Sequence, residues 1–370
     1  MIGRRDAMLA GAAALLAPRA EAASFDAAAL PRGEWTRLHE QSAGDSVTFR
    51  RQLHGGAAFD TKRGRIVLFG SDEHGEDWTN SPFFFDVATL RWIRLYPDDD
   101  PSTYRADRFG LPVAGTDGNH PWAMHTFGTV TYHEANDAIV ISIYPDHLRP
   151  DRFTNALAHV WPQVRRHPTW VLDLATEAWK PLPGPAVHFF PYATAYDPRR
   201  RVVIGYKEEG VYELRPQPIG WTRLAVPGLL GYANSAVFDT KHDALVVFGS
   251  HTGLDDIVIY QPATKRHQKM PTPGLRPPKA TSRPMAFHAG IGQTVMLFDS
   301  KADGDRSLPG PGHAETWLYD LGRDAWTRLS ARLPFRLGMN YNLVYDPQRA
   351  LLLLVAGGPA QPTSVWGLRL

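Results

Sequence analysis

Histidine, arginine, tyrosine and asparagine side chains stand at, or just before, the start of six short β-rich segments of the sequence. They are Arg51, His54, His120, His125, His188, Tyr232, Arg283, Arg336 and Asn340. Arginine holds a carboxylate through a bidentate fork, and histidine or a partly deprotonated tyrosine can move a proton near neutral pH. We therefore predict that the arginines bind an acidic ligand and that His125, His188 or Tyr232 transfers a proton. The alternative is that these polar groups only solvate the mouth of a water-filled channel.

Two tryptophans and one acidic segment add weaker signals. Trp78 and Trp122 lie in long polar segments, where an exposed indole ring can stack on a sugar, although packing within the loop is the commoner use. Together with His54, His120 and Asn340, they complete the predicted substrate-binding surface. The metal-ligand candidates are Asp72, His74 and Asp77. Solvation of a polar loop explains those three side chains equally well, so the sequence identifies no metal and no cofactor.

An internal repeat shows which elements must position these residues. Its first line is an aromatic residue, usually followed by Asp, then a short polar turn and an apolar β-rich run. The six copies of this line begin at Ala57, Val130, Thr194, Ala236, Met285 and Leu343. A second line, a strand and a turn followed by a strand that usually carries Trp, comes after each of the first five copies. Its copies begin at Phe83, Trp170, Val211, Ile257 and Thr316.

The sixth copy ends at SVWGLRL without its last strand, and the segment GEWTRL near the start of the chain has the sequence of such a strand. Each unit predicts four short strands. One such sheet cannot bury both faces alone, whereas several sheets packed around an axis bury one another in a closed ring. We therefore expect an all-β fold over residues 33–370. It is a six-bladed β-propeller of four-stranded antiparallel sheets, in which the N-terminal strand completes the last blade and covers its open edge.

The repeated lines resemble kelch repeats. The resemblance rests on the aromatic–Asp line, on a Phe-Gly or Gly-Gly pair after the second strand, such as Phe69-Gly70 and Gly357-Gly358, and on the Asp…Trp line. It covers nearly all of residues 33–370. The double glycine is intact only in the last copy, so the chain is similar to a divergent kelch-type propeller. The resemblance implies the fold, but it does not imply an activity.

The turns of such a sheet alternate between the two faces of the ring. The turns between first and second strands, and between third and fourth strands, are short, and we call that side the short-turn face. The connections on the opposite side, the long-loop face, include residues 71–82, 96–122, 144–168 and 299–315. Long loops on a rigid scaffold concentrate binding residues, and the innermost strand of each blade starts on this face. We therefore predict a ligand site at the channel mouth on the long-loop face.

Residues 1–22 have the features of an export signal, with Arg4 and Arg5, an apolar run and a small-x-small site ending at Ala22. The arginine pair resembles a twin-arginine signal, while the residues that follow it leave an ordinary secretory signal open. The apolar run is shorter than the roughly 20 residues that a membrane-spanning helix needs. We expect a periplasmic or secreted protein without a transmembrane segment.

Composition narrows the function classes. The absence of cysteine excludes a thiolate nucleophile, a cysteine metal ligand and the cysteine–tyrosine crosslink of galactose-oxidase-type copper sites. A copper or iron site built from histidine and carboxylate stays open. A net charge of +2 at pH 7, without a long run of Lys and Arg, does not favour nucleic-acid binding.

Two main hypotheses remain. The first is a lyase or epimerase for an acidic sugar or oligosaccharide, similar in layout to N-acetylneuraminate epimerase and to propeller-type polysaccharide lyases. Such chemistry removes a proton from the carbon beside a carboxylate, whose charge an arginine must offset. The second is a non-catalytic propeller that binds a glycan or a protein partner on the same face.

Overall fold

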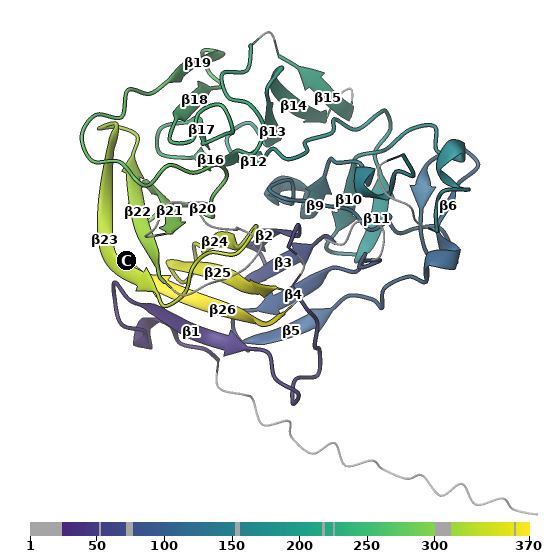
Figure 1. Cartoon of the computed structure of the whole chain (residues 1–370), viewed down its shortest axis with the longest axis horizontal. Helices are drawn as coiled ribbons and strands as arrows, with labels where there is room; N and C mark the ends of the chain where they lie inside the picture. The colour runs from purple at the N-terminus through teal and green to yellow at the C-terminus, as the bar shows by residue number, and fades with distance from the viewer. Residues whose placement is uncertain are drawn as a thin grey trace, which may run out of the picture.

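The computed structural model describes residues 24–370 except 52, 72–76, 152–155, 217–218, 225, 300–311 and 359. These residues form six four-stranded antiparallel sheets, arranged as blades around a central axis (Figure 1). The predicted six-bladed β-propeller is therefore confirmed. The expected export signal in residues 1–22 lies outside the described residues. Within them, no helix has the length and apolar character needed to cross a membrane.

Each blade has its innermost strand at the channel and its outermost strand at the rim. From inside to outside, blade by blade, the strands are β2 (Gly56–Asp60), β3 (Arg65–Phe69), β4 (Phe83–Asp86) and β5 (Arg91–Arg94); β8 (Thr131–His133), β9 (Ala138–Ile141), β10 (Trp170–Asp173) and β11 (Ala178–Pro181); β12 (Thr194–Asp197), β13 (Val202–Lys207), β14 (Gly210–Pro216) and β15 (Ile219–Arg223); β16 (Ser235–Asp239), β17 (Ala244–Phe248), β18 (Ile257–Gln261) and β19 (Arg266–Lys269); β20 (Met285–His288), β21 (Gln293–Asp299), β22 (Ala314–Asp320) and β23 (Ala325–Leu333); β24 (Asn342–Asp346), β25 (Leu351–Gly358), β26 (Gln361–Arg369) and β1 (Trp35–Glu40).

The second strand of a blade is largely buried because it lies between two neighbouring blades. β3 and β17 bury all five of their residues, and β25 buries all eight. Apolar side chains of blades one and six share one hydrophobic core, which includes Ile66, Leu68, Leu351 and Leu353. Four of the outermost strands bury a tryptophan: Trp35, Trp92, Trp179 and Trp326. The core is therefore distributed between the blades, which holds the ring rigid around its axis.

The short turns between first and second strands repeat one polar arrangement. Oδ1 of Asp60 accepts the backbone N–H groups of the residues two and three positions on, both at 3.1 Å. Arg63 then bridges Asp60, at 3.1 Å, to Asp137 of blade two, at 2.7 Å. The Arg63 guanidinium holds the pKa of Asp137 well below its usual range. The same arrangement links blades three and four through Asp197, Arg200 and Asp243.

Two blades carry histidine in place of this aspartate. Nδ1 of His133 and of His288 accepts the backbone N–H three residues on, at 3.3 Å in both turns. The residue three positions on is Asn136 in one turn and Ile291 in the other, so neither turn supplies a cation there. Burial lowers the pKa of both imidazoles, which favours their neutral form. A buried carboxylate therefore occurs where the turn also supplies a cation or a histidine to pair with it, as Asp346 and Arg349 do at 2.8 Å.

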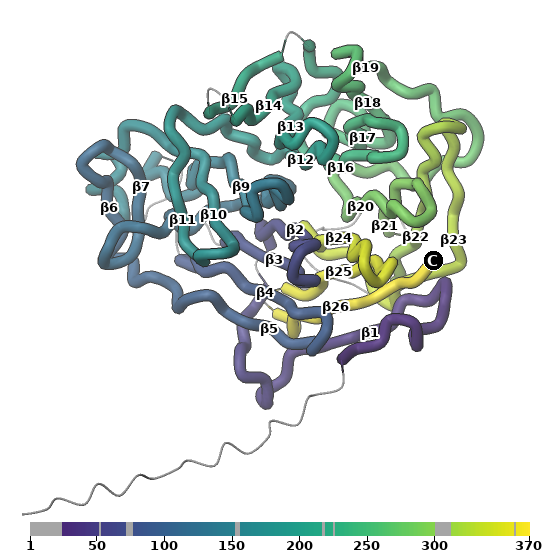
Figure 2. Tube along the Cα trace, turned by 180° about the vertical axis from the view of Figure 1, so that it is seen from behind, coloured from purple at the N-terminus to yellow at the C-terminus, as the bar shows by residue number. Residues whose placement is uncertain are grey.

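The ring closes through the N-terminal strand. β1 pairs antiparallel with β26, with Trp35 opposite Leu368 and Glu40 opposite Ser364. Nε1 of Trp35 donates to Thr316 Oγ1 at 2.9 Å, which also ties the seam to blade five. Both views show β1 alongside β26 at the outer edge of the sixth blade (Figures 1 and 2). The prediction that GEWTRL completes the last blade is confirmed.

Two long connections, residues 95–130 and 142–169, form a small core of their own. It contains Tyr104, Trp122, Leu148, Leu157 and Val160. The first connection carries the short hairpin β6 (Arg105–Ala106) and β7 (Pro112–Val113), which lies at the outer edge of the ring (Figures 1 and 2). The 3-10 turns of the fold are η1 (Ala27–Ala29), η2 (Pro101–Thr103), η3 (Glu134–Asn136), η4 (Asp146–Leu148) and η5 (Trp161–Gln163).

Candidate functional site

A channel of about 1000 Å³ lies along the axis, between the six innermost strands. Small side chains such as Ala57, Ala195 and Ala236 form much of its wall. At the end where the innermost strands begin, which we call the channel mouth, the polar side chains that line it include His54, Tyr232, Asn234, Arg283, Asn340 and Asn342. Four of the residues predicted from the sequence therefore meet here, because the loop before each innermost strand reaches the axis.

Arg283 carries the only permanent charge among the described residues that line the channel, and no carboxylate is among them. Ser235 fixes its backbone from the neighbouring blade. The Ser235 hydroxyl donates to the Arg283 carbonyl at 2.8 Å, and its oxygen lies 2.9 Å from the Arg283 N–H. A cation in a wall whose described residues include no carboxylate favours an anionic ligand.

Two asparagines flank Arg283 on the neighbouring blades. Nδ2 of Asn234 donates to the Gly231 carbonyl at 3.0 Å, which fixes the orientation of the amide. Asn234 is 4% exposed, and its Oδ1 has no hydrogen-bond partner in the described part of the chain. Nδ2 of Asn340 likewise has no acceptor among the described residues. Because buried polar atoms are nearly always paired in folded proteins, these two amides are candidates to bind polar atoms of a ligand.

The opposite part of the mouth carries stacked histidines. The ring of His54, at the channel, lies 4.2 Å from the ring of His125, and His125 lies 4.1 Å from His147. We call these three residues the histidine column. His125 and His147 are 2% and 1% exposed, so only His54 reaches the channel. His147 Nε2 lies 3.4 Å from Ser71 Oγ.

His188 lies beside the column, in the connection between blades two and three. Its Nδ1 accepts the backbone N–H of Tyr144 at 2.9 Å, and its Nε2 lies 3.8 Å from Asp146 Oδ2. The ring of Tyr144 stacks between those of His188 and His167, at 4.5 and 4.6 Å. Burial, together with nearby His188, lowers the pKa of His167 to about 4. His188 therefore belongs to an aromatic and imidazole cluster behind the mouth.

Tyr232 is the most solvent-accessible of the predicted site residues at the mouth. It is 48% exposed, and its ring stacks on that of His251 at 3.8 Å. The stacking fixes a flat aromatic surface on blade four, beside Asn234. Such a surface suits contact with the apolar face of a sugar ring.

The structure places two predicted arginine ligands outside the channel wall. Arg51 is fully buried, and its guanidinium donates to the Met339 carbonyl and to Asn342 Oδ1, both at 3.2 Å. These contacts join the loop before blade one to blade six. Arg336 lies 3.9 Å from the carboxylate of Asp299. Arg283 is thus the predicted arginine that the fold brings to the channel.

The predicted tryptophans and His120 lie in the insertions, away from the axis. Trp122 is fully buried and donates through Nε1 to the Val113 carbonyl at 2.9 Å, and Trp78 packs partly buried against the same small core. The ring faces of Trp122 are therefore covered by protein in this structure. A loop tryptophan is as well suited to anchoring an insertion as to binding a sugar, and here it anchors.

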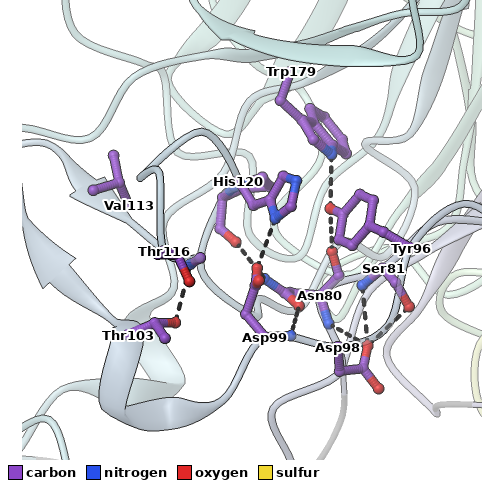
Figure 3. Close-up of polar contacts among 12 residues, drawn as sticks. Asn80, Ser81, Tyr96, Asp98, Asp99, Thr103, Val113, Thr116, His120 and Trp179 are labelled. Carbon is purple, nitrogen blue, oxygen red and sulfur yellow. Dashed lines mark hydrogen bonds and ion pairs between the residues drawn. The ribbon is translucent and has the colours of Figure 1, made fainter.

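His120 belongs to a polar network at the junction of blades one and two (Figure 3). Its Nδ1 lies 2.8 Å from Asp99 Oδ2, and its ring stacks on Tyr96 at 3.9 Å. Asn80 also donates to Asp99, at 2.8 Å, and Trp179 donates to the Tyr96 hydroxyl at 2.8 Å. Burial raises the pKa of Tyr96 well above its usual range. The network fixes the insertion to the blades, and none of its residues lines the channel.

Asp77 is the only one of the three weak metal-ligand candidates within the described residues. Its Oδ1 accepts the backbone N–H of Thr79 at 2.9 Å, an arrangement typical of a turn. Asp72 and His74 lie outside the described residues. Within the described ranges, no three histidine and carboxylate side chains are placed to hold a metal ion.

Sequence reasoning missed His147, Asp146 and Ser71. All three belong to connections between second and third strands, whose length was visible but whose path was not. The signal that could have found them is the Asp-His pair at positions 146 and 147, in the connection that follows the buried strand β9. Asn234 also lines the channel, and it precedes its innermost strand in the same way as the predicted residues do.

A scan against protein-family models gives no match, and a search of curated proteins finds none with significant similarity. The fold and the site therefore define the class directly. The chain is a six-bladed β-propeller that closes through its N-terminal strand and has a polar channel mouth, where Arg283 is the one arginine among the described lining residues. The kelch assignment rests on the repeated sequence lines alone.

Proposed function

We propose that this propeller binds an acidic sugar, or the end of an acidic oligosaccharide, at the channel mouth. The observation that carries the proposal is Arg283, the one permanent charge among the described residues of the channel wall, none of which is a carboxylate. A carboxylate that binds there gains a charge-assisted hydrogen bond, and it meets no carboxylate among the described lining residues. Arg283 is also positioned before the ligand arrives, because Ser235 holds its backbone.

The groups beside Arg283 favour a sugar acid over a simple carboxylate. Oδ1 of Asn234 needs a donor such as a hydroxyl group, and Nδ2 of Asn340 needs an acceptor. A sugar hydroxyl can serve in either role. The exposed ring of Tyr232 offers an apolar surface to the sugar ring. The mouth thus offers Arg283 to the carboxylate of a sugar acid, two asparagines to its hydroxyl groups and the ring of Tyr232 to its apolar face.

Two forms of this function are distinguished by turnover. In the first, the protein processes the sugar by removing the proton beside the carboxylate, as a lyase or an epimerase does, and the imidazoles near the mouth support it. In the second, it only binds the glycan. The export signal expected in residues 1–22 would deliver either form to the periplasm or the exterior. Nuclear magnetic resonance spectra of the sugar before and after incubation decide between the two.

Calorimetric titration tests the binding itself. Galacturonate, glucuronate and N-acetylneuraminate are compared with neutral galactose and glucose. We expect at least one of the acids to bind and the neutral sugars to bind far more weakly. Arg283→Gln should weaken the acid by about 10- to 100-fold, the range expected when a hydrogen bond to a charged group is lost.

The matched control is Arg37→Gln, which changes an exposed arginine on the outermost strand β1. It should leave the affinity unchanged. Equal affinity of wild type and Arg283→Gln, or equal binding of galactose and galacturonate, would contradict the proposal.

A further inference from the structure

Large apolar side chains stand exposed in one sector of the long-loop face, over blade four. Among the described residues, eight large apolar side chains are exposed, and half of them belong to the connections that enter, cross and leave this blade. They are Leu229 and Tyr232 between β15 and β16, Leu254 between β17 and β18, and Leu275 between β19 and β20. We call these four residues the apolar patch. Exposed apolar side chains are normally scattered singly over a protein, so their gathering in one sector marks a candidate binding surface.

The connections that carry the two outer leucines of the patch lie side by side. The backbone N–H of Ala280 donates to the Leu254 carbonyl at 2.8 Å, which joins the connection before blade five to the one inside blade four. Asp255 and Arg276, the residues that directly follow Leu254 and Leu275, form an ion pair at 3.5 Å. The two leucines therefore belong to one surface, although they are distant in the sequence.

The patch joins the channel mouth at Tyr232. The backbone N–H of His251, in the same connection as Leu254, donates to the Tyr232 carbonyl at 3.1 Å, and the two rings stack at 3.8 Å. Tyr232 is 48% exposed and also lines the channel. Two residues further on, Asn234 lines the mouth with an Oδ1 that has no hydrogen-bond partner in the described part of the chain. A ligand that occupies the mouth therefore meets the patch through the ring of Tyr232.

The area of the patch favours a small apolar group over a protein partner. Its residues are 37% to 56% exposed, and a large side chain has about 150–250 Å² of surface, so together they offer about 400 Å² at most. A stable protein–protein interface buries about 800 Å² on each partner. An alkyl chain or an aromatic ring needs far less area than that. The occupant that fits is thus an apolar part of the same ligand whose sugar lies in the mouth.

We propose that the ligand is a glycoside of a sugar acid with an apolar aglycone, that is, an alkyl chain or an aromatic ring joined to the sugar. The acidic sugar occupies the mouth, and the aglycone binds on the apolar patch. The inference rests on the proposed function, because it extends the same ligand outward from Tyr232. Each methylene group that is buried against the leucines adds to the affinity that the sugar provides. The substrate class is therefore narrower than acidic sugars as a whole.

Calorimetric titration with a graded series of ligands tests the patch. The ligands are methyl, butyl and octyl galacturonide, each below the concentration at which it forms micelles. A fully buried methylene group raises the affinity by about fourfold and a half-buried one by about twofold. Octyl galacturonide should therefore bind at least about 10-fold more tightly than methyl galacturonide. The neutral octyl galactoside should bind more weakly than octyl galacturonide, because it lacks the carboxylate that Arg283 binds.

The double variant Leu254→Ser with Leu275→Ser removes two leucines that do not line the channel. It should lose about fivefold or more of the affinity for octyl galacturonide and keep the affinity for methyl galacturonide within about twofold. The matched control is Ile219→Ser, which changes a residue that is 50% exposed on the outermost strand β15 of blade three. It should bind both ligands as wild type does. Because all three side chains are exposed, the variants should fold as wild type does, which thermal unfolding checks.

The outcomes separate the inference from the proposed function. If methyl and octyl galacturonide bind equally well to wild type, or if the double variant binds octyl galacturonide as tightly as wild type, the inference fails and the binding of the acidic sugar stands. If neither galacturonide binds, the proposed function fails, and octyl galactoside tests the patch alone. Binding of octyl galactoside that the double variant loses would support the patch. No binding, or equal binding by wild type and the double variant, would overturn the patch as well.

Discussion

The two faces of the propeller use charge in opposite ways. On the short-turn face, Arg63 lies within 3.1 Å of two carboxylates, and Arg200 repeats the arrangement one blade pair further on. At the channel mouth on the long-loop face, Arg283 stands in a wall whose described residues include no carboxylate. A repeated and balanced set of charges stabilises the ring, whereas Arg283 lies in the wall of a channel that a ligand can enter. The arrangement of charges thus distinguishes the structural short-turn face from the candidate site at the channel mouth.

The largest expected effect is on the short-turn face. Asp60→Ala removes a fully buried carboxylate that accepts two backbone N–H groups and pairs with Arg63 and Arg65. We expect a loss of about 3–5 kcal/mol in the free energy of unfolding, because buried donors and cations lose their partner. Denaturant unfolding measures the loss. Asp60→Asn, which keeps an acceptor oxygen, should lose less. A loss near zero for Asp60→Ala would contradict the view that this face is structural.

The second prediction tests whether aspartate can replace the turn histidine only when a cation is introduced with it. His288→Asp places a buried carboxylate in blade five where residue 291 supplies no cation, and it should destabilise the fold by about 3 kcal/mol. The double variant His288→Asp with Ile291→Arg rebuilds the arrangement of the other blades and should recover at least half of that loss. Equal unfolding free energies for the single and double variants would show that the pairing does not govern this position.

A third effect is the pH dependence contributed by His167 on the long-loop face. Its pKa is lowered to about 4 by burial, from 6.5 in the unfolded chain, so the folded state binds fewer protons in this range. The contribution of neutral His167 to the free energy of unfolding is therefore complete above about pH 6.5. It is lost as the pH falls towards 4. Between these values wild type should lose on the order of 2 kcal/mol more than His167→Asn. Parallel curves of unfolding free energy against pH for the two proteins would rule the contribution out.

The smallest effect is expected for an exposed charge of the same short-turn face. The side chain of Lys62 is 61% exposed, and its partner Asp137 is also held by Arg63. Lys62→Ala should change the free energy of unfolding by less than about 0.5 kcal/mol, because exposed ion pairs are screened. A loss as large as that of Asp60→Ala would mean that burial does not determine how much a charge on this face stabilises the fold.

The fold could be predicted because the first repeated line occurs six times and only the last unit lacks its final strand. Trp35 in GEWTRL matches Trp221 and Trp326 of other outermost strands, and the missing strand of the last unit gave it one place to pair. The site could be predicted only in part. Residues tied to the start of an innermost strand, such as His54 and Arg283, reach the channel because the scaffold brings them there.

Residues in the insertions could not be placed from the sequence. Trp122 and His120 were predicted at the ligand surface, yet they pack in a small core and a polar network at the rim. The path of a long connection depends on contacts with another connection distant in sequence, which no local pattern reports. For the same reason the sequence did not bring His147 to His125. The periodic part of the chain was therefore predictable, and its irregular part was not.

The most direct test of the central claim is a crystal structure of the protein with galacturonate bound. The account predicts density for the sugar at the channel mouth, with its carboxylate about 3 Å from the guanidinium of Arg283 and a hydroxyl group at a similar distance from Asn234 Oδ1. Density for the sugar outside the channel, or within it but with the carboxylate turned away from Arg283, would contradict the account.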